Sequence, residues 1–164
     1  MKSFSLKADA RFFVSDNLED LLASASSDSF IQNAKEKGIQ EVFITVSKEN
    51  ADASKLKAAD SELKESRIHT SYISLDRVRE NNFTYIDSIL KYIHEANRNR
   101  TCLFLFNAAD RKAALSLLPV LLMDTSTAGA AVQETRKRGF ASPQEFASEY
   151  EAHRKGRSPR TEAA

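Results

Sequence analysis

An arginine follows a short loop at the end of an apolar run, and this part of the sequence is the best suited to bind an anion. Residues 102–106 are continuously apolar and predict a buried strand. The loop 107–110 follows, and Arg111 opens a second apolar stretch that predicts a helix. A helix N-terminus offers free N–H groups and the positive end of its dipole, and a guanidinium group can pair with phosphate or carboxylate through two hydrogen bonds. The order of strand, loop, arginine and helix therefore predicts an anion-binding loop.

The elements around this loop predict an α/β fold. Short apolar runs alternate with longer amphipathic stretches, a pattern typical of parallel strands covered by helices. We expect a central, mostly parallel sheet of four to five strands flanked by helices. The predicted strands are residues 11–14, 41–46, 68–75 and 102–106, and the predicted helices are residues 17–37 with a break around 26–28, 50–65, 82–97, 111–123, 127–137 and 143–154.

The length and the charge balance of the chain limit its organisation and its partners. At 164 residues it fits one domain, which we expect over residues 1–152, followed by a basic C-terminal tail over residues 153–164. Lys and Arg total 24 against 23 Asp and Glu, so the formal charge of +1 gives no reason to expect nucleic acid as a partner. The longest apolar stretch, residues 113–123, is about half of the roughly 20 residues that cross a bilayer, so we expect no membrane insertion.

The single cysteine, Cys102, indicates an intracellular protein because it excludes an internal disulfide. The first residues lack the apolar core of a signal peptide, so we take the cytoplasm as the default compartment. An organelle is left open. Cys102 lies in an apolar run, where a cysteine usually behaves as a small hydrophobic residue. The three histidines are too scattered for metal-ligand spacing. We therefore predict neither a metal site nor a cofactor.

The strand, loop and arginine resemble the signature of the cysteine-dependent tyrosine and dual-specificity phosphatases. In that family the loop reads His-Cys-x5-Arg-Ser/Thr, and aligning its arginine with Arg111 places Leu105 at the cysteine position. The resemblance extends over residues 11–150. The segment from Tyr72 to Asp76 is similar to the family's Tyr-x-x-Ile/Leu-x-Asp pattern, and Gly38-Ile39 are similar to its early Gly-Ile turn. The resemblance implies a tyrosine-phosphatase-like fold, with Asp76 near the position of the general acid.

Four positions of the loop depart from the family pattern. Leu105 replaces the nucleophilic cysteine, and Phe104 replaces the histidine before it. Ala108 stands where the loop needs glycine, and Lys112 replaces the Ser/Thr after the arginine. Because a leucine side chain cannot attack phosphorus, these departures imply that the chain is not an enzyme but a degenerate member of the family, a pseudophosphatase.

The residues that remain in the loop leave three functions open. We expect no catalytic residue, and the candidate site for an anion or a partner is the degenerate loop of Leu105, Asn107, Ala108, Asp110, Arg111 and Lys112. In the first hypothesis the domain is a protein-interaction or structural subunit of a larger assembly, and Arg111 pairs with Asp76 or Asp110 to brace the loop. In the second it binds a phosphorylated ligand through Arg111 without hydrolysing it. In the third it is another kind of enzyme, with Asp76 and Asp110 flanking a polar cavity.

Overall fold

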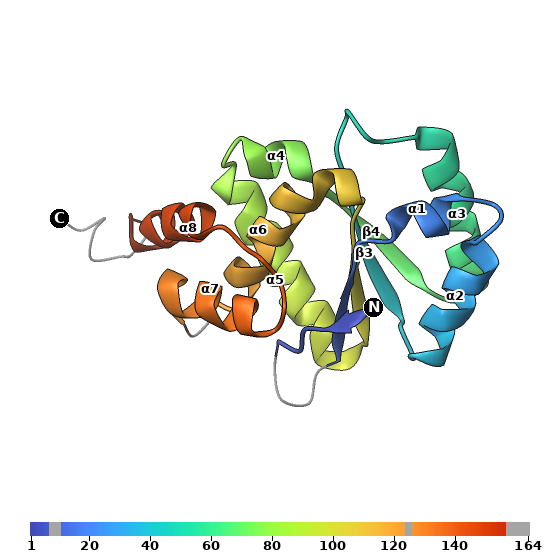
Figure 1. Ribbon diagram of the computed structural model, residues 1–164, viewed down its shortest axis with the longest axis horizontal. Helices are drawn as coiled ribbons and strands as arrows, with labels where there is room; N and C mark the ends of the chain where they lie inside the picture. Colours follow the sequence, from blue (N-terminus) through green and yellow to red (C-terminus); the bar gives the residue numbers. More distant parts are fainter. Residues whose placement is uncertain (7–10, 124–125, 157–164) are drawn as a thin grey trace.

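A five-stranded sheet lies between two layers of helices in the computed structural model, which describes residues 1–6, 11–123 and 126–156 (Figure 1). The strands are β1 (Lys2–Ser3), β2 (Phe12–Ser15), β3 (Glu41–Val46), β4 (His69–Ser74) and β5 (Cys102–Leu105). The helices are α1 (Leu18–Leu22), α2 (Ser27–Glu36), α3 (Ala53–Glu65), α4 (Leu75–Arg79), α5 (Phe83–Asn99), α6 (Arg111–Leu121), α7 (Ala128–Lys137) and α8 (Gln144–Gly156), and a 3-10 turn, η1, covers Ala108–Asp110.

The order of the strands in the sheet is β1-β2-β5-β3-β4. Strands β2, β5, β3 and β4 are parallel to one another, and the short β1 runs antiparallel to β2. Strand β5 is central, because Leu105 pairs with Ser15 of β2 on one side and with Ile44 of β3 on the other. The predicted fold class, a mostly parallel sheet of four to five strands flanked by helices, is confirmed.

The side chains of β5 alternate between the two hydrophobic cores of the molecule. Phe104 belongs to the core beneath α5, α6, α7 and α8, whereas Leu103 and Leu105 belong to the core beneath α1, α2 and α3. Figure 1 shows these two groups of helices on opposite faces of the sheet. Such burial on both faces explains why this strand is continuously apolar rather than alternating.

Three segments differ from the sequence predictions, the first being the two-residue strand β1, for which no strand was predicted. The short helix α4 begins at the last residue of the strand predicted at 68–75 and continues over positions for which we predicted no element. It is only five residues long and buries just Leu75 and Val78, so its local sequence carries little helical pattern. Helix α8 continues to Gly156, two residues beyond the predicted helix, and so includes residues 153–156 of the predicted tail. It is held there by His153, whose Nε2 lies 3.0 Å from Oδ2 of Asp87. The rest of the predicted tail, residues 157–164, lies outside the described residues.

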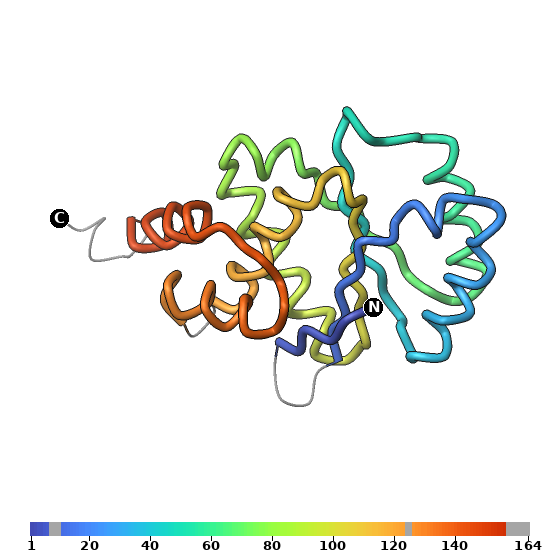
Figure 2. Tube along the Cα trace, viewed as in Figure 1, coloured from blue at the N-terminus to red at the C-terminus, as the bar shows by residue number. Residues whose placement is uncertain are grey.

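The path from β5 into α6 can be followed in the trace of Figure 2, where the chain leaves the middle of the sheet and turns into the helix layer. Residues in this central helix are buried nearly all round, from Ala113 to Leu121. Among the described residues, no helix combines the length and the apolar character that crossing a membrane requires.

Candidate functional site

The loop between β5 and α6 lies at the carboxyl edge of the sheet, beside the residues that follow β3. Because β3 and β5 are parallel neighbours, their C-terminal ends meet at the same edge. Ser47 and Asn50, which follow β3, therefore come within hydrogen-bond distance of Asp110 in the loop. Ligand sites of parallel α/β sheets are found at this edge, so the loop has the position of a functional site.

Asp110 is the centre of a buried polar network at this edge. Its side chain is only 2% exposed. The hydroxyl group of Ser47 lies 3.1 Å from each carboxylate oxygen, and Nδ2 of Asn50 donates to Oδ1 at 2.9 Å. Arg79 of α4 donates to the same oxygen from Nη2 at 2.9 Å. The side-chain donors around the loop therefore form hydrogen bonds with the carboxylate of Asp110, which is itself a residue of the loop.

Asp76 lies at the same edge, at the start of α4. Its Oδ2 accepts a hydrogen bond from the backbone N–H of Lys48 at 3.0 Å, and its Oδ1 lies 3.6 Å from Nη1 of Arg79. Arg79 therefore connects Asp76 with Asp110. Since both carboxylates contact this guanidinium, the arginine that links them comes from α4 and not from α6.

Arg111 points to a different part of the molecule. Its Nη1 lies 3.1 Å from Oδ2 of Asp16, in the segment between β2 and α1, and about half of each side chain is exposed. The expected ion pair of Arg111 with Asp76 or Asp110 is wrong, because Arg79 occupies both carboxylates. Arg111 instead joins the loop to the end of β2.

The remaining loop residues use their polar groups within the loop. The side-chain oxygen of Asn107 accepts a hydrogen bond from the N–H of Ala109 at 2.9 Å, and its carbonyl accepts one from the N–H of Asp110 at 2.8 Å. Leu105 is fully buried at the end of β5, while Ala108 is exposed. The N–H groups of Ala109 and Asp110 are therefore already hydrogen-bonded within the loop and are not free to bind an anion.

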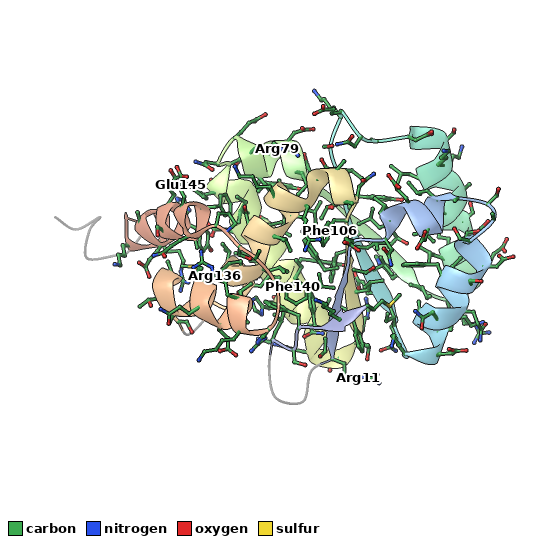
Figure 3. The ribbon with its side chains drawn as sticks, in the orientation of Figure 1. Arg11, Arg79, Phe106, Arg136, Phe140 and Glu145 are labelled. Carbon is green, nitrogen blue, oxygen red and sulfur yellow. The ribbon has the colours of Figure 1, made fainter. Side chains whose placement is uncertain are left out.

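A cavity of about 560 Å³ adjoins Asp110 and is lined mainly by residues of α4, α6 and α8. Figure 3 shows Arg79 and Glu145 on this side of the molecule. Two cationic side chains, Arg79 and Lys112, line the cavity together with three acidic ones, Asp110, Glu145 and Glu149. The side chains that line the cavity therefore carry a net formal charge of −1, which disfavours an anionic ligand.

Positive charge collects instead on the other side of Lys112. A second cavity, of about 580 Å³, is lined by Lys112, Arg136 and residues 139–143, and none of its lining residues is acidic. Arg136 and Phe140 are labelled in Figure 3. A smaller cavity of about 170 Å³ shares Phe140 and is lined by Lys2, Arg111 and Asp16. We call Lys2, Arg111, Lys112 and Arg136 the basic surface.

Cys102 lies on β5 but at its other end, away from the loop. The side chain is fully buried, and burial raises the pKa of its thiol to about 11. A thiol with this pKa stays protonated near neutral pH, and the protonated form is a poor nucleophile.

Comparison with solved structures identifies the fold. The chain superimposes on Tk-PTP, described in its active form, with a TM-score of 0.55 and 13% sequence identity, over 96% of this chain and 98% of that one. It has a tyrosine-phosphatase fold. A protein from Leishmania major that is assigned as a protein tyrosine phosphatase matches with a TM-score of 0.50 and 12% identity, over 85% of this chain and 86% of that one. No protein-family model and no curated protein sequence matches the chain.

The prediction that this chain is not an enzyme is contradicted by this comparison. The tyrosine-phosphatase fold is shared, over nearly the whole chain, with a phosphatase whose structure is described in its active form. The prediction rested on four replaced positions of one loop, namely Phe104, Leu105, Ala108 and Lys112. A site is built from groups that several elements bring together, so the composition of one loop is too narrow a basis for that conclusion.

Sequence reasoning missed most of the partners of the loop. It selected Asp76, Asp110 and Arg111 but not Ser47, Asn50 or Arg79, which hold Asp110, nor Asp16, which pairs with Arg111. A signal for Ser47 and Asn50 was present, since polar residues that follow two neighbouring parallel strands meet at one edge. Arg79 carried no such signal, because α4 was not predicted.

Proposed function

We propose that this domain is a protein-interaction module that binds an acidic segment of a partner protein on the basic surface. Carboxylate and phosphorylated side chains share the chemistry that such a surface recognises, namely an anion that guanidinium and ammonium groups can contact. The proposal keeps Arg111 and Lys112 of the predicted loop as partner-binding residues and adds Lys2 and Arg136.

The observation that supports the proposal is the separation of charge around the start of α6. On one side, Asp110 takes up the donors of the loop, and the adjoining cavity carries three acids against two cations. On the other side, Lys112 and Arg136 line a cavity without any acidic residue. A negatively charged segment is therefore attracted to the second side and repelled from the first.

Three cations of the basic surface, Lys2, Lys112 and Arg136, have no acidic partner among the described residues, whereas Arg111 is paired with Asp16. The ammonium group of Lys112 is exposed and has no side-chain partner among the described residues. Arg136 donates to the carbonyl oxygen of Ser142 from Nε and Nη2, at 3.3 and 3.0 Å, and Ser142 in turn donates to the carbonyl of Leu115. The ammonium group of Lys2 lies 5.5 Å from the centre of the Phe140 ring. These contacts position Arg136 and Lys2 before a partner binds, while Lys112 remains free to contact it.

Binding of two labelled peptides to the full chain tests the proposal. Fluorescence anisotropy is measured with a fluorescein-labelled hexaglutamate peptide and with a phosphoserine peptide of equal length, at low and at physiological salt. We expect both to bind, more weakly as salt rises. Lys112→Glu is expected to weaken binding at least about tenfold, because like charges across an interface cost several kcal/mol. Stronger binding of the phosphoserine peptide would identify phosphorylated segments as the natural source of the anion.

The matched control is Lys57→Glu, which reverses an exposed lysine of α3 on the opposite layer of helices. This variant is expected to bind like the wild type. If the wild type binds neither peptide, or if both reversals weaken binding equally, the attraction is not specific to the basic surface and the proposal fails.

A further inference from the structure

Strand β4 forms an edge of the sheet, and half of its backbone polar groups point outward. In the described part of the chain, β4 pairs only with β3. The N–H of His69 donates to the carbonyl of Gln40, which precedes β3, so the groups of His69 and of every second residue after it face β3. The N–H and C=O groups of Thr70, Tyr72 and Ser74 therefore face away from the sheet.

Of these three residues, only Ser74 has a hydrogen-bond partner for its backbone N–H group among the described residues. The N–H of Ser74 donates to the hydroxyl oxygen of Tyr85 at 2.7 Å. The described residues provide no partner for the N–H and C=O groups of Thr70 and Tyr72, and Oγ1 of Thr70 is buried without a hydrogen-bond partner. The free edge thus consists of two donors and two acceptors on alternate residues.

Two residues that commonly protect natural edge strands are missing from this edge. The strand His69–Ser74 contains neither lysine nor proline. The large hydrophobic residues that are exposed in the described chain, Tyr72 and Tyr92, are 45% and 42% exposed. Tyr92 lies beside the same strand, because its hydroxyl group is 3.4 Å from Oγ of Ser71.

We propose that two copies of this chain associate through β4, antiparallel and across a two-fold axis, so that the two sheets become one. With Ser71 opposite Ser71 of the second copy, each Thr70 faces a Tyr72 of the other copy. Four hydrogen bonds then form between the strands and satisfy all the free groups of both edges. Antiparallel pairing also places Arg67, which precedes β4, at the same end of the strand pair as Asp76 of the other copy, which follows β4. The charges of these two side chains are opposite and attract each other.

The bond from Ser74 to Tyr85 selects this register. If the axis passed through Tyr72 instead, each Thr70 would face Ser74 of the other copy, and the N–H of Ser74 would have to leave the Tyr85 hydroxyl group. The register centred on Ser71 requires no such exchange. A second copy presents the same two donors and two acceptors on alternate residues, so its free groups match this edge one for one in this register. The edge is separate from the basic surface.

Disulfide trapping of the full chain tests both the association and its register. In the proposed dimer the two Ser71 residues form a non-hydrogen-bonded pair with Cα atoms about 4.5 Å apart, within the range that a disulfide bridges. Copies of residue 72 are displaced by two positions and lie beyond the roughly 7 Å limit. We expect Ser71→Cys to form a covalent dimer under mild oxidation and Tyr72→Cys to form little, while Cys102 is buried and does not interfere.

Light scattering coupled to size-exclusion chromatography measures the association without a cross-link. The wild type is expected to approach twice the mass of one chain as concentration rises, and Tyr72→Lys to raise the dissociation constant about tenfold or more, because a lysine protects an edge strand. The control Gln133→Lys adds the same charge on α7 and is expected to dimerise normally. A monomeric wild type at several hundred micromolar, or faster cross-linking through Tyr72→Cys than through Ser71→Cys, would overturn the proposal.

Discussion

Replacing Asp110 with alanine is expected to destabilise the fold by about 2–3 kcal/mol. The carboxylate is 2% exposed and accepts hydrogen bonds from Ser47, Asn50 and Arg79. Hydrogen bonds to charged groups contribute about 1.5–3 kcal/mol each, but the cost of burying the carboxylate offsets part of this sum. Since the Arg79 side chain is 42% exposed, its ion pair is discounted for solvent screening. The remaining loss comes mainly from the side chains of Ser47 and Asn50, which would lose their acceptor on Asp110.

Urea unfolding followed by circular dichroism measures this loss, and thermal unfolding should show a midpoint lowered by roughly 5–10 °C for a chain of this size. Asp110→Asn keeps the shape but removes the charge, so its effect should lie between alanine and wild type. The control is Asp76→Ala, because this carboxylate is 34% exposed and receives one backbone hydrogen bond. It should cost less than about 1 kcal/mol. If Asp110→Ala costs no more than Asp76→Ala, the network does not hold the loop in place.

Two further outcomes follow from the central strand. Burial raises the pKa of the Cys102 thiol to about 11, so at about pH 8 it should react with a thiol reagent far more slowly in the folded protein than in denaturant. The reaction of the folded protein should become faster as the pH rises. Reaction at the rate of a free cysteine would contradict this. Leu105→Ala should cost about 2–4 kcal/mol in urea unfolding, because a fully buried leucine leaves a cavity in the core beneath α1, α2 and α3, and a loss below about 1 kcal/mol would show that this core closes around the gap.

Some of this structure follows from local sequence. The β-branched and aromatic composition of residues 41–46 and the continuous apolar run 102–106 favour buried strands, and the spacing of Phe83, Ile86 and Leu90 favours a helix with one face in the core. Local patterns of this kind depend only on the spacing of apolar residues and on the residue types within one segment, so they can be recognised in the sequence without the tertiary structure. They sufficed for the fold class and for the position of the loop before α6.

Other features were decided only by the tertiary structure. Arg111 and Asp110 are adjacent in sequence, yet one pairs with Asp16 and the other with Arg79, because the helix start directs the two side chains to different neighbours. The sequence determined which charged residues lie at the carboxyl edge of the sheet, including Asp110 and Arg111. The packing of β2, β3 and α4 around β5 decided which of them are paired with each other, since an ion pair depends on distances between elements far apart in the chain.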